Sequence, residues 1–427
     1  MNPISVAFEG KGPSHAARRA VNILGNYGVT PAKMGRALQQ FAAILGQFGC
    51  RATFPITATV LRRNPDVVEE YQALGLEFAI HGYRHLDHFR LSRTEQLAQL
   101  ELARQLFDEV GVQAKGFRAP YLHANADTLA ALQDQHLSYD SSQGLNWLVP
   151  NARATPSYGH LLRFYGALSA SAYPSLPSLQ GNLTCIPYSL PDDEALANHL
   201  SLQKTDQMSE IWLAVLRRSH QLGELFTLGL HPERMLICQE PLTVVLSEAR
   251  KLYPPVWIAR LDEIADWWRA RSAAEVRISD TAGGRLRVSV AGPSGTTVLV
   301  RGVEVDAATQ AWADGYREVQ GTTFTVRSPR RPFIGVSPTV SPELSTFVRQ
   351  QGYIVETSQH GDRYAHCLQQ TRFHAQDQRT LLAQIEGTSF PLVRLGRWPH
   401  GAHSALAITG DIDALTLWDY GLRFLGR

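Results

Sequence analysis

Apolar and polar positions follow two different patterns along the chain. Up to about residue 271, short apolar runs alternate with segments whose apolar residues recur three and four positions apart. The runs are predicted strands, and the segments between them are predicted amphipathic helices. We expect strands at 4–8, 52–56, 76–80, 183–186 and Leu225–Leu230, and helices at 34–48, 94–110, 128–135 and 258–271. This alternation indicates a parallel sheet, so residues 1–272 are predicted to form an α/β domain.

The second pattern begins at about residue 275, where single apolar and polar residues alternate, as in Leu286-Arg-Val-Ser-Val290. Turns rich in Gly and Pro separate these runs, and the pattern predicts a small antiparallel β module over 273–340. The module is interpreted either as a carbohydrate-binding domain or as a scaffold. Its aromatic residues are few, which favours a scaffold: Trp312, Tyr316, Phe324 and Phe333.

Helical periodicity returns after Pro342, at 344–351 and 374–386, so residues 341–395 are predicted to be an α/β connecting segment. Residues 396–427 contain one more strand, 404–409, and one more helix, 415–425. A single strand and helix has no core of its own, so this tail must pack on another part of the chain.

Composition narrows the class of protein. The 427 residues carry 41 Lys and Arg against 39 Asp and Glu, and this near-neutral balance gives no electrostatic footprint for nucleic acid. No run of about 18 apolar residues predicts a membrane-spanning helix, and the first residues lack the pattern of a signal peptide. The four cysteines are far apart and form no CxxC motif, so we expect a cytoplasmic protein without a disulfide framework.

Polar residues follow several of the predicted strands. His81-Gly-Tyr-Arg-His85 follows the strand 76–80, Arg118-Ala-Pro-Tyr121 follows Phe117, Asp140 follows Tyr139, and His231 follows Leu225–Leu230. In a barrel of parallel strands the carboxyl ends converge on one face, where active sites are built. We therefore expect these residues to meet in space.

Each of these residues has a structural interpretation beside the functional one. His81 and His85, four positions apart, can bind one face of a divalent ion or be ordinary core histidines. Arg118 can hold a catalytic carboxylate or form a simple ion pair. Asp140 can orient a neighbouring catalytic group or cap the turn that follows it. His231 can act as a general acid or be structural.

Taken together, the motifs resemble the polysaccharide deacetylase family, the NodB-like carbohydrate esterases, over about residues 30–270. His81-Gly-Tyr-Arg-His85 is similar to the family's metal-binding motif, although Gly82 stands where Ser or Thr is usual. Arg118-Ala-Pro-Tyr121 resembles its groove motif, Asp140-Ser-Ser142 its fourth motif, and Leu230-His231 the motif of its catalytic histidine. The resemblance implies a distorted (β/α) barrel that hydrolyses N-acetyl groups with a divalent metal.

The family's first motif, a strand that ends in two aspartates, is incomplete at the N-terminus. Only Glu9 stands there, but Ala405-Leu-Ala-Ile-Thr-Gly-Asp411-Ile-Asp413 near the C-terminus is an apolar strand that ends in Asp-x-Asp. We predict that the tail 396–427 docks on the barrel as in a circular permutation. The alternative is that the tail packs on 340–395 or begins a degenerate second copy of the domain, and that Asp411 only caps a helix.

The resemblance then assigns the roles. His81, His85 and Asp413 hold a divalent metal, with Zn²⁺ expected, and Asp411 is the base that activates water. Arg118 holds Asp411, and the backbone N–H near Tyr121 stabilises the oxyanion. His231 protonates the departing amine, and Asp140 positions its neighbours.

The expected reaction is hydrolysis of an N-acetyl group on an amino sugar or polysaccharide precursor, so the expected partner is a carbohydrate that carries an N-acetylated amino sugar. Two alternatives remain at this point. One is a non-catalytic barrel that binds sugar or a partner, and the other is a deformylase of a lipid-linked sugar. The oligomeric state cannot be read from the sequence.

Overall fold

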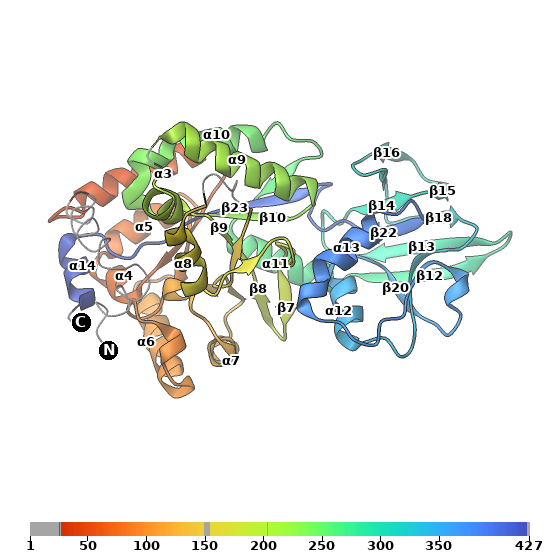
Figure 1. Cartoon of the computed structure of the whole chain (residues 1–427), viewed down its shortest axis with the longest axis horizontal. Helices are drawn as coiled ribbons and strands as arrows, with labels where there is room; N and C mark the ends of the chain where they lie inside the picture. The colour runs from red at the N-terminus through yellow and green to blue at the C-terminus, as the bar shows by residue number, and fades with distance from the viewer. Residues whose placement is uncertain (1–24, 26, 149–153, 203, 425–427) are drawn as a thin grey trace.

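The computed structural model describes residues 25, 27–148, 154–202 and 204–424. Its main element is a 12-stranded sheet with the order β6-β5-β9-β10-β23-β1-β2-β3-β4-β8-β7, in which β11 also pairs with β23. All neighbours are parallel except β7 and β8. Figure 1 shows helices covering the outside of this curled sheet. The predicted distorted (β/α) barrel is confirmed, whereas the predicted strand 4–8, with Glu9, lies outside the described residues.

The strands of the sheet are β1 (Thr53–Ile56), β2 (Glu77–Ile80), β3 (Gly116–Phe117), β4 (Tyr139–Asp140), β5 (Gly144–Asn146), β6 (Leu168–Ser169), β7 (Ser178–Gln180), β8 (Leu183–Cys185), β9 (Tyr188–Leu190), β10 (Leu225–Leu230), β11 (Val256–Ile258) and β23 (Ser404–Gly410). The helices around it are α3 (Ala32–Gln47), α4 (Ala58–Arg63), α5 (Pro65–Ala73), α6 (Arg93–Glu109), α7 (Ala126–Asp134), α8 (Pro156–Phe164), α9 (Thr205–Gln221), α10 (Met235–Ala249), α11 (Leu261–Ser272) and α14 (Leu417–Phe424). None of the helices in the described ranges is long and apolar enough to cross a lipid bilayer.

One predicted helix boundary is wrong. Ile258 belongs to strand β11, which pairs with the first residues of β23, and the helix α11 begins only at Leu261. Local capping sets this start, because the Glu263 side chain accepts a hydrogen bond from the backbone N–H of Arg260 at 2.8 Å. Such a cap helps to fix where a helix begins, and helical periodicity alone does not reveal it.

Strand β23 brings the C-terminal tail into the middle of the barrel sheet (Figure 1). Six consecutive residue pairs join it to β10, from Leu225 with Ala405 to Leu230 with Gly410. On its other side it pairs with β11 and, further along, with β1. All seven of its residues are buried, as expected for a central strand with an uninterrupted apolar run.

The second lobe lies beside the barrel, at the right of Figure 1. It contains an antiparallel sheet β12-β13-β18-β15, a second antiparallel sheet β16-β17-β14-β22, and a parallel sheet β20-β19-β21. The strands are β12 (Glu275–Thr281), β13 (Arg285–Ala291), β14 (Val298–Arg301), β15 (Glu304–Val305), β16 (Thr309–Ala311), β17 (Arg317–Val319), β18 (Thr323–Arg327), β19 (Arg331–Val336), β20 (Val355–Thr357), β21 (Tyr364–Leu368) and β22 (Leu392–Leu395). Its helices are α12 (Pro342–Gln350) and α13 (Gln378–Glu386).

Strand β19 departs from the expected antiparallel module. Both of its partners, β20 and β21, are parallel to it and come from the segment 341–395. Helix α12 connects β19 to β20, and a parallel pair requires a crossover connection of this kind. The predicted module and the predicted connecting segment are therefore interleaved in one lobe.

A shared core joins the lobe to the barrel. One cluster of buried side chains includes Trp268 from the barrel helix α11, Leu299 and Ile334 from the lobe, and Trp398 from the segment that leads into β23. The Trp268 and Trp398 rings lie 5.4 Å apart, and the Trp398 indole donates a hydrogen bond to the carbonyl of Gly223. Because Trp398 fills space between both parts, the path from the lobe into β23 is packed along its length.

Candidate active site

The carboxyl ends of the central strands surround a cleft with about 470 Å³ of empty space, part of it open to solvent. His81 follows β2, His231 follows β10, and Asp411 and Asp413 follow β23. These four side chains all line the cleft, together with His85 and Tyr121. Residues far apart in sequence thus meet at one face of the barrel, where parallel strands place their functional groups.

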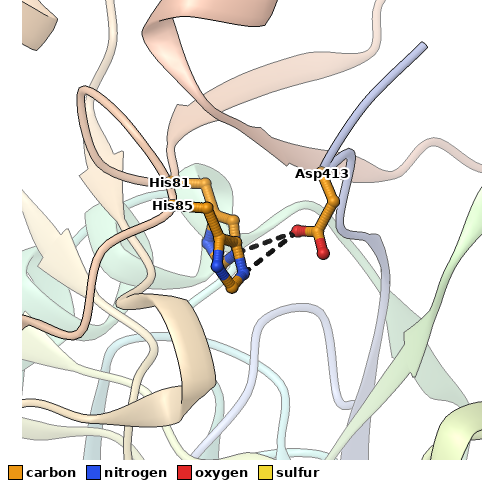
Figure 2. A group of neighbouring side chains, drawn as sticks. All are labelled: His81, His85 and Asp413. Carbon is orange, nitrogen blue, oxygen red and sulfur yellow. Dashed lines mark ion pairs between the residues drawn. The ribbon is translucent and has the colours of Figure 1, made fainter. Parts of the chain in front are cut away.

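A cluster of potential metal ligands lies in this cleft (Figure 2). The Nε2 atoms of His81 and His85 are 3.4 and 3.3 Å from the same carboxylate oxygen, Oδ1 of Asp413. One ligand atom from each residue lies within 4.8 Å of the others. Two imidazole nitrogens and one carboxylate oxygen form the donor set of many catalytic zinc sites, which keep a further position open for water or substrate.

The hydrogen bond on the far side of His81 prepares this imidazole for coordination. Its Nδ1 lies 2.8 Å from the backbone carbonyl of Arg118, and His81 is 3 % exposed. A carbonyl oxygen can only accept, so Nδ1 carries the hydrogen and Nε2 keeps its lone pair toward the cleft.

The loop between the two histidines depends on a glycine. Gly82 has φ +83°, and a Cβ at this position would lie 2.7 Å from the carbonyl oxygen of Arg84. The loop also docks on helix α4, since the N–H groups of Ala58 and Thr59 donate to the carbonyls of Gly82 and Tyr83. The glycine that departs from the resembled motif is thus required by the left-handed turn that brings His81 and His85 together.

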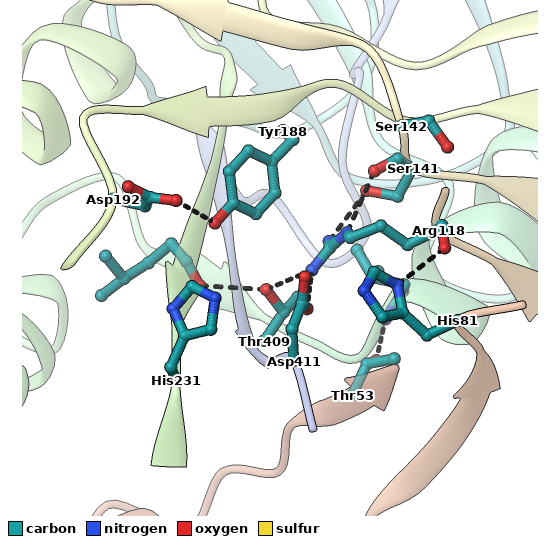
Figure 3. A network of polar contacts seen from close by, with 12 residues as sticks. Thr53, His81, Arg118, Ser141, Ser142, Tyr188, Asp192, His231, Thr409 and Asp411 are labelled. Carbon is teal, nitrogen blue, oxygen red and sulfur yellow. Dashed lines mark hydrogen bonds and ion pairs between the residues drawn. The ribbon is translucent and has the colours of Figure 1, made fainter. Parts of the chain in front are cut away.

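Asp411 is held by a buried arginine (Figure 3). Arg118 is fully buried, and its Nη1 donates to Oδ1 of Asp411 at 2.6 Å and to Oγ1 of Thr409 at 2.9 Å. The rest of the guanidinium donates to the carbonyl and the hydroxyl of Ser141, and it lies 4.6 Å from the centre of the Tyr188 ring. This arrangement fixes the position of the Asp411 carboxylate.

The turn after Arg118 has an unusual backbone. Tyr121 and Leu122 have φ values of 61° and 58°, in the left-handed region that side chains other than glycine seldom adopt. Both line the cleft, and the Tyr121 ring stands edge-on to His85 at 4.6 Å. Consecutive strained residues in a binding cleft indicate that the turn is held in place for function.

His231 forms a pair with a residue that the sequence analysis missed. Its Nδ1 is 2.6 Å from Oδ1 of Asp193, and its backbone N–H donates to Oδ2 of the same carboxylate at 2.7 Å. Burial lowers the pKa of His231, but the Asp193 carboxylate outweighs burial and raises this pKa well above its ordinary value. The pair therefore favours the protonated form of His231, which can donate a proton.

Asp193 follows strand β9 (Tyr188–Leu190), which was not among the predicted strands. Applying the strand-end argument to this run would have drawn attention to Asp192-Asp193. Asp192 lines the cleft, and its Oδ2 accepts a hydrogen bond from the Tyr188 hydroxyl at 2.8 Å. Burial, together with Asp193, raises the pKa of Asp192 to about 6.

The structure does not bring Asp140 into the cleft. Its Oδ1 accepts from the Ser142 hydroxyl at 2.5 Å, and its Oδ2 accepts from the Ser142 N–H at 3.3 Å. The Ser142 hydroxyl in turn accepts from the N–H of Ala119, beside Arg118. Of the two interpretations of Asp140, the turn cap describes these contacts, and the residue contributes to the site only by supporting the loop that holds Arg118.

Fold and site together define an open (β/α) barrel with a cluster of metal-ligand type at the carboxyl ends of its strands. The model of the polysaccharide deacetylase family matches residues 12–139, a segment that contains His81, His85 and Arg118. The resemblance drawn from the motifs is thereby confirmed. A comparison with curated protein sequences gives no match.

Several solved structures are similar to this chain. A probable polysaccharide deacetylase from Pseudomonas aeruginosa PAO1 is 18% identical, with 56% of this chain and 75% of that chain covered and a TM-score of 0.44. An allantoinase has the same identity and TM-score over 55% of this chain and 72% of its own. A pseudoenzyme of carbohydrate esterase family 4 from Bacillus anthracis is 12% identical, with 54% and 61% covered and a TM-score of 0.31.

Proposed function

We propose that this protein is a metal-dependent hydrolase that removes the N-acetyl group from an amino sugar. The observation that carries the proposal is the convergence of three units on one cleft. These are the ligand cluster His81, His85 and Asp413, the Asp411–Arg118 pair, and the His231–Asp193 pair. Each unit supplies one requirement of amide hydrolysis, namely activation of the carbonyl, activation of water and protonation of the amine.

The residues present fit a divalent ion. His81 has its Nε2 lone pair directed to the cleft, and Asp413 brings a carboxylate oxygen close to both histidines. Two imidazoles and a carboxylate suit Zn²⁺ better than Mg²⁺ or Ca²⁺, which prefer sites made of oxygen ligands. An ion held there would polarise the acetamide carbonyl and lower the pKa of water.

Asp411 serves as the general base. It lines the same cleft as Asp413, two residues further along the chain, and Arg118 fixes its carboxylate from behind. As the water oxygen attacks the carbonyl carbon, Asp411 accepts the proton that the water loses. The backbone N–H at the strained Tyr121 turn stabilises the negative charge that develops on the carbonyl oxygen.

His231 serves as the general acid. Because the Asp193 carboxylate stabilises the protonated ring, the imidazolium can donate a proton to the amide nitrogen while the carbon–nitrogen bond breaks. The products are a free amine on the sugar and acetate. Asp193 also accepts from the backbone N–H of His231, which holds the ring in one orientation.

The test compares Asp413→Asn with a matched surface variant, Asp134→Asn, whose carboxylate is about half exposed on helix α7. After incubation with zinc and gel filtration, the wild type and Asp134→Asn should each carry one zinc per chain, and Asp413→Asn should carry much less with an unchanged circular dichroism spectrum. Acetate release from N-acetylglucosamine oligomers should follow the metal content. Retention of zinc at wild-type strength by Asp413→Asn would falsify the ligand assignment.

The same assay separates the alternatives. A protein that binds zinc and oligosaccharide without releasing acetate would be a non-catalytic barrel. Release of formate from N-formyl substrates, with no acetate from N-acetyl substrates, would reassign the acyl group.

A further inference from the structure

Tyr188 lies between the two halves of the proposed catalytic site (Figure 3). It belongs to strand β9, is buried and lines the cleft. Its ring lies against the guanidinium of Arg118, which holds the base. Its hydroxyl donates to Oδ2 of Asp192 at 2.8 Å, and the residue after Asp192 is Asp193, the partner of His231. One side chain therefore contacts the support of the base and the support of the acid.

The turn after β9 is held through the side chain of Asp192. Besides the Tyr188 hydroxyl on Oδ2, the backbone N–H of Ala195 donates to Oδ1 at 2.8 Å. Asp192 is 3 % exposed, so water cannot replace a lost donor without a rearrangement of the turn. A carboxylate in such surroundings keeps one direction because each missing hydrogen bond is costly away from water.

This turn determines how His231 is placed as a proton donor. Asp193 follows Asp192 directly and holds both Nδ1 and the backbone N–H of His231, at 2.6 and 2.7 Å. The imidazole also interacts electrostatically with Glu194 from the same turn and with Glu233 from its own loop. Asp192 in turn interacts with the imidazole, which favours the ionised carboxylate. A displaced turn would therefore change the direction of the ring and the stabilisation of its protonated form.

A second tyrosine of the barrel has the same packing at the opposite end of the strands. Tyr139 on β4 is fully buried, and its hydroxyl donates at 2.8 Å to Oε1 of Glu77, the first residue of β2. Both tyrosines pass over a glycine of the neighbouring strand, since a Cβ at Gly116 or at Gly229 would lie 1.9 Å from an atom of the tyrosine. Tyr139 thus matches Tyr188 in burial and hydrogen bonding but lies away from the cleft, so it provides a control.

We propose that Tyr188 is a positioning residue for the proton-donating half of the site. Its hydroxyl holds Asp192, and through Asp192 it holds the turn that places Asp193 against His231. Loss of the hydroxyl therefore impairs protonation of the departing amine more than the attack of water. This inference rests on the proposed function, because it assigns the proton donor of the amide hydrolysis.

The test compares Tyr188→Phe with Tyr139→Phe on two acetyl substrates. Tyr188→Phe keeps the ring against Arg118 and removes only the hydrogen bond to Asp192. The amine that leaves an N-acetylglucosamine tetramer needs a proton, whereas 4-nitrophenyl acetate releases a stable phenolate that needs none. We expect the ratio of kcat/KM for the amide to that for the ester to fall by about tenfold in Tyr188→Phe, mainly through kcat, and to stay at the wild-type value in Tyr139→Phe. An unchanged ratio in Tyr188→Phe, or an equal fall in Tyr139→Phe, would overturn the proposal.

A titration of His231 by nuclear magnetic resonance separates this inference from the proposed function. Tyr188→Phe leaves the buried Asp192 carboxylate with one donor fewer, so its charged form is less favoured and it stabilises the imidazolium less. The pKa of His231, whose signal is assigned by its absence from His231→Gln, should therefore be lower in Tyr188→Phe than in the wild type and in Tyr139→Phe. A full chain that releases no acetate but shows this shift contradicts the hydrolase and supports the positioning role. A His231 pKa that is the same in Tyr188→Phe and in the wild type refutes the positioning role, whether or not acetate is released.

Discussion

Replacing Gly82 with alanine tests whether the turn between the two histidines sets the geometry of the metal cluster. Two costs are expected. An alanine at φ +83° is strained by about 1–2 kcal/mol, because the left-handed region brings Cβ close to the following carbonyl. In addition, the new Cβ would lie 2.7 Å from the Arg84 carbonyl oxygen. This oxygen belongs to the backbone and cannot rotate away as the end of a side chain can. The turn must therefore open by several tenths of an ångström.

Gly111 provides a matched control for the backbone strain alone, without the contact with a carbonyl oxygen. It has φ +79° at the end of helix α6, and a Cβ there would have no neighbour within 4 Å. Gly111→Ala should therefore lose about 1–2 kcal/mol of the free energy of unfolding in urea and keep its zinc affinity. Gly82→Ala should lose more stability, and its zinc affinity should fall by about tenfold or more, because metal sites tolerate displacements of only about 0.2 Å.

The two measurements are urea unfolding and zinc titration against a competing chelator, both on the full chain. The reasoning is refuted if Gly82→Ala binds zinc as tightly as Gly111→Ala does. Equal unfolding free energies for the two variants would likewise show that the contact with the Arg84 carbonyl is relieved without cost.

Three further variants follow from the site and its supports. Asp193→Asn removes the carboxylate that raises the pKa of His231, so the alkaline limb of the kcat/KM profile should move to lower pH; an unmoved limb excludes His231 as the acid. Burial raises the pKa of Asp140 to about 6 from 3.8, so its stabilising effect is complete below pH 3.8 and is lost as pH rises through 6. Asp140 should thus contribute a fall of ~3 kcal/mol to the free energy of unfolding across that window, so the difference in this free energy between the wild type and Asp140→Asn should change by that amount. Asp419→Ala removes the carboxylate that accepts from the N–H and the hydroxyl of Thr416 at the start of helix α14 and that pairs with Arg63, and it should cost about 1–3 kcal/mol in urea unfolding.

The parts of the fold that the sequence predicted are those in which periodicity and burial agree. Strand β10 carries six consecutive buried residues, and its predicted bounds Leu225–Leu230 match the structure. Helix α6 was expected over 94–110 and spans Arg93–Glu109. Such elements are long enough for a local pattern to determine their type, and the polar residues at strand ends followed from the geometry of parallel sheets.

The remaining features of the fold and of the site depend on contacts that no local sequence pattern encodes. Strand β9 has three residues, too few for a periodic signal, so Asp193 at its end went unnoticed although it pairs with His231. The role of Asp140 was undecided because the direction of its side chain is set by Ser142, two residues later. Strand β19 belongs to the segment of alternating residues and was therefore expected to pair with antiparallel neighbours. Its actual partners come later in the chain, beyond helix α12, and they are parallel to it.

The packing of the C-terminal tail also determines what a metal can contribute to the fold. Leu406, Ile408, Ile412 and Leu415 are each at most 1 % exposed, and burying such a side chain stabilises the folded state by about 1.5–3 kcal/mol. Their combined contribution is of the same order as the whole stability of a typical domain. The tail is therefore held in the sheet by its apolar strand, and Asp411 and Asp413 are positioned whether or not an ion is bound. For this reason the loss of metal in Asp413→Asn should leave the barrel folded, and the same strand that completes the core also delivers both carboxylates to the cleft.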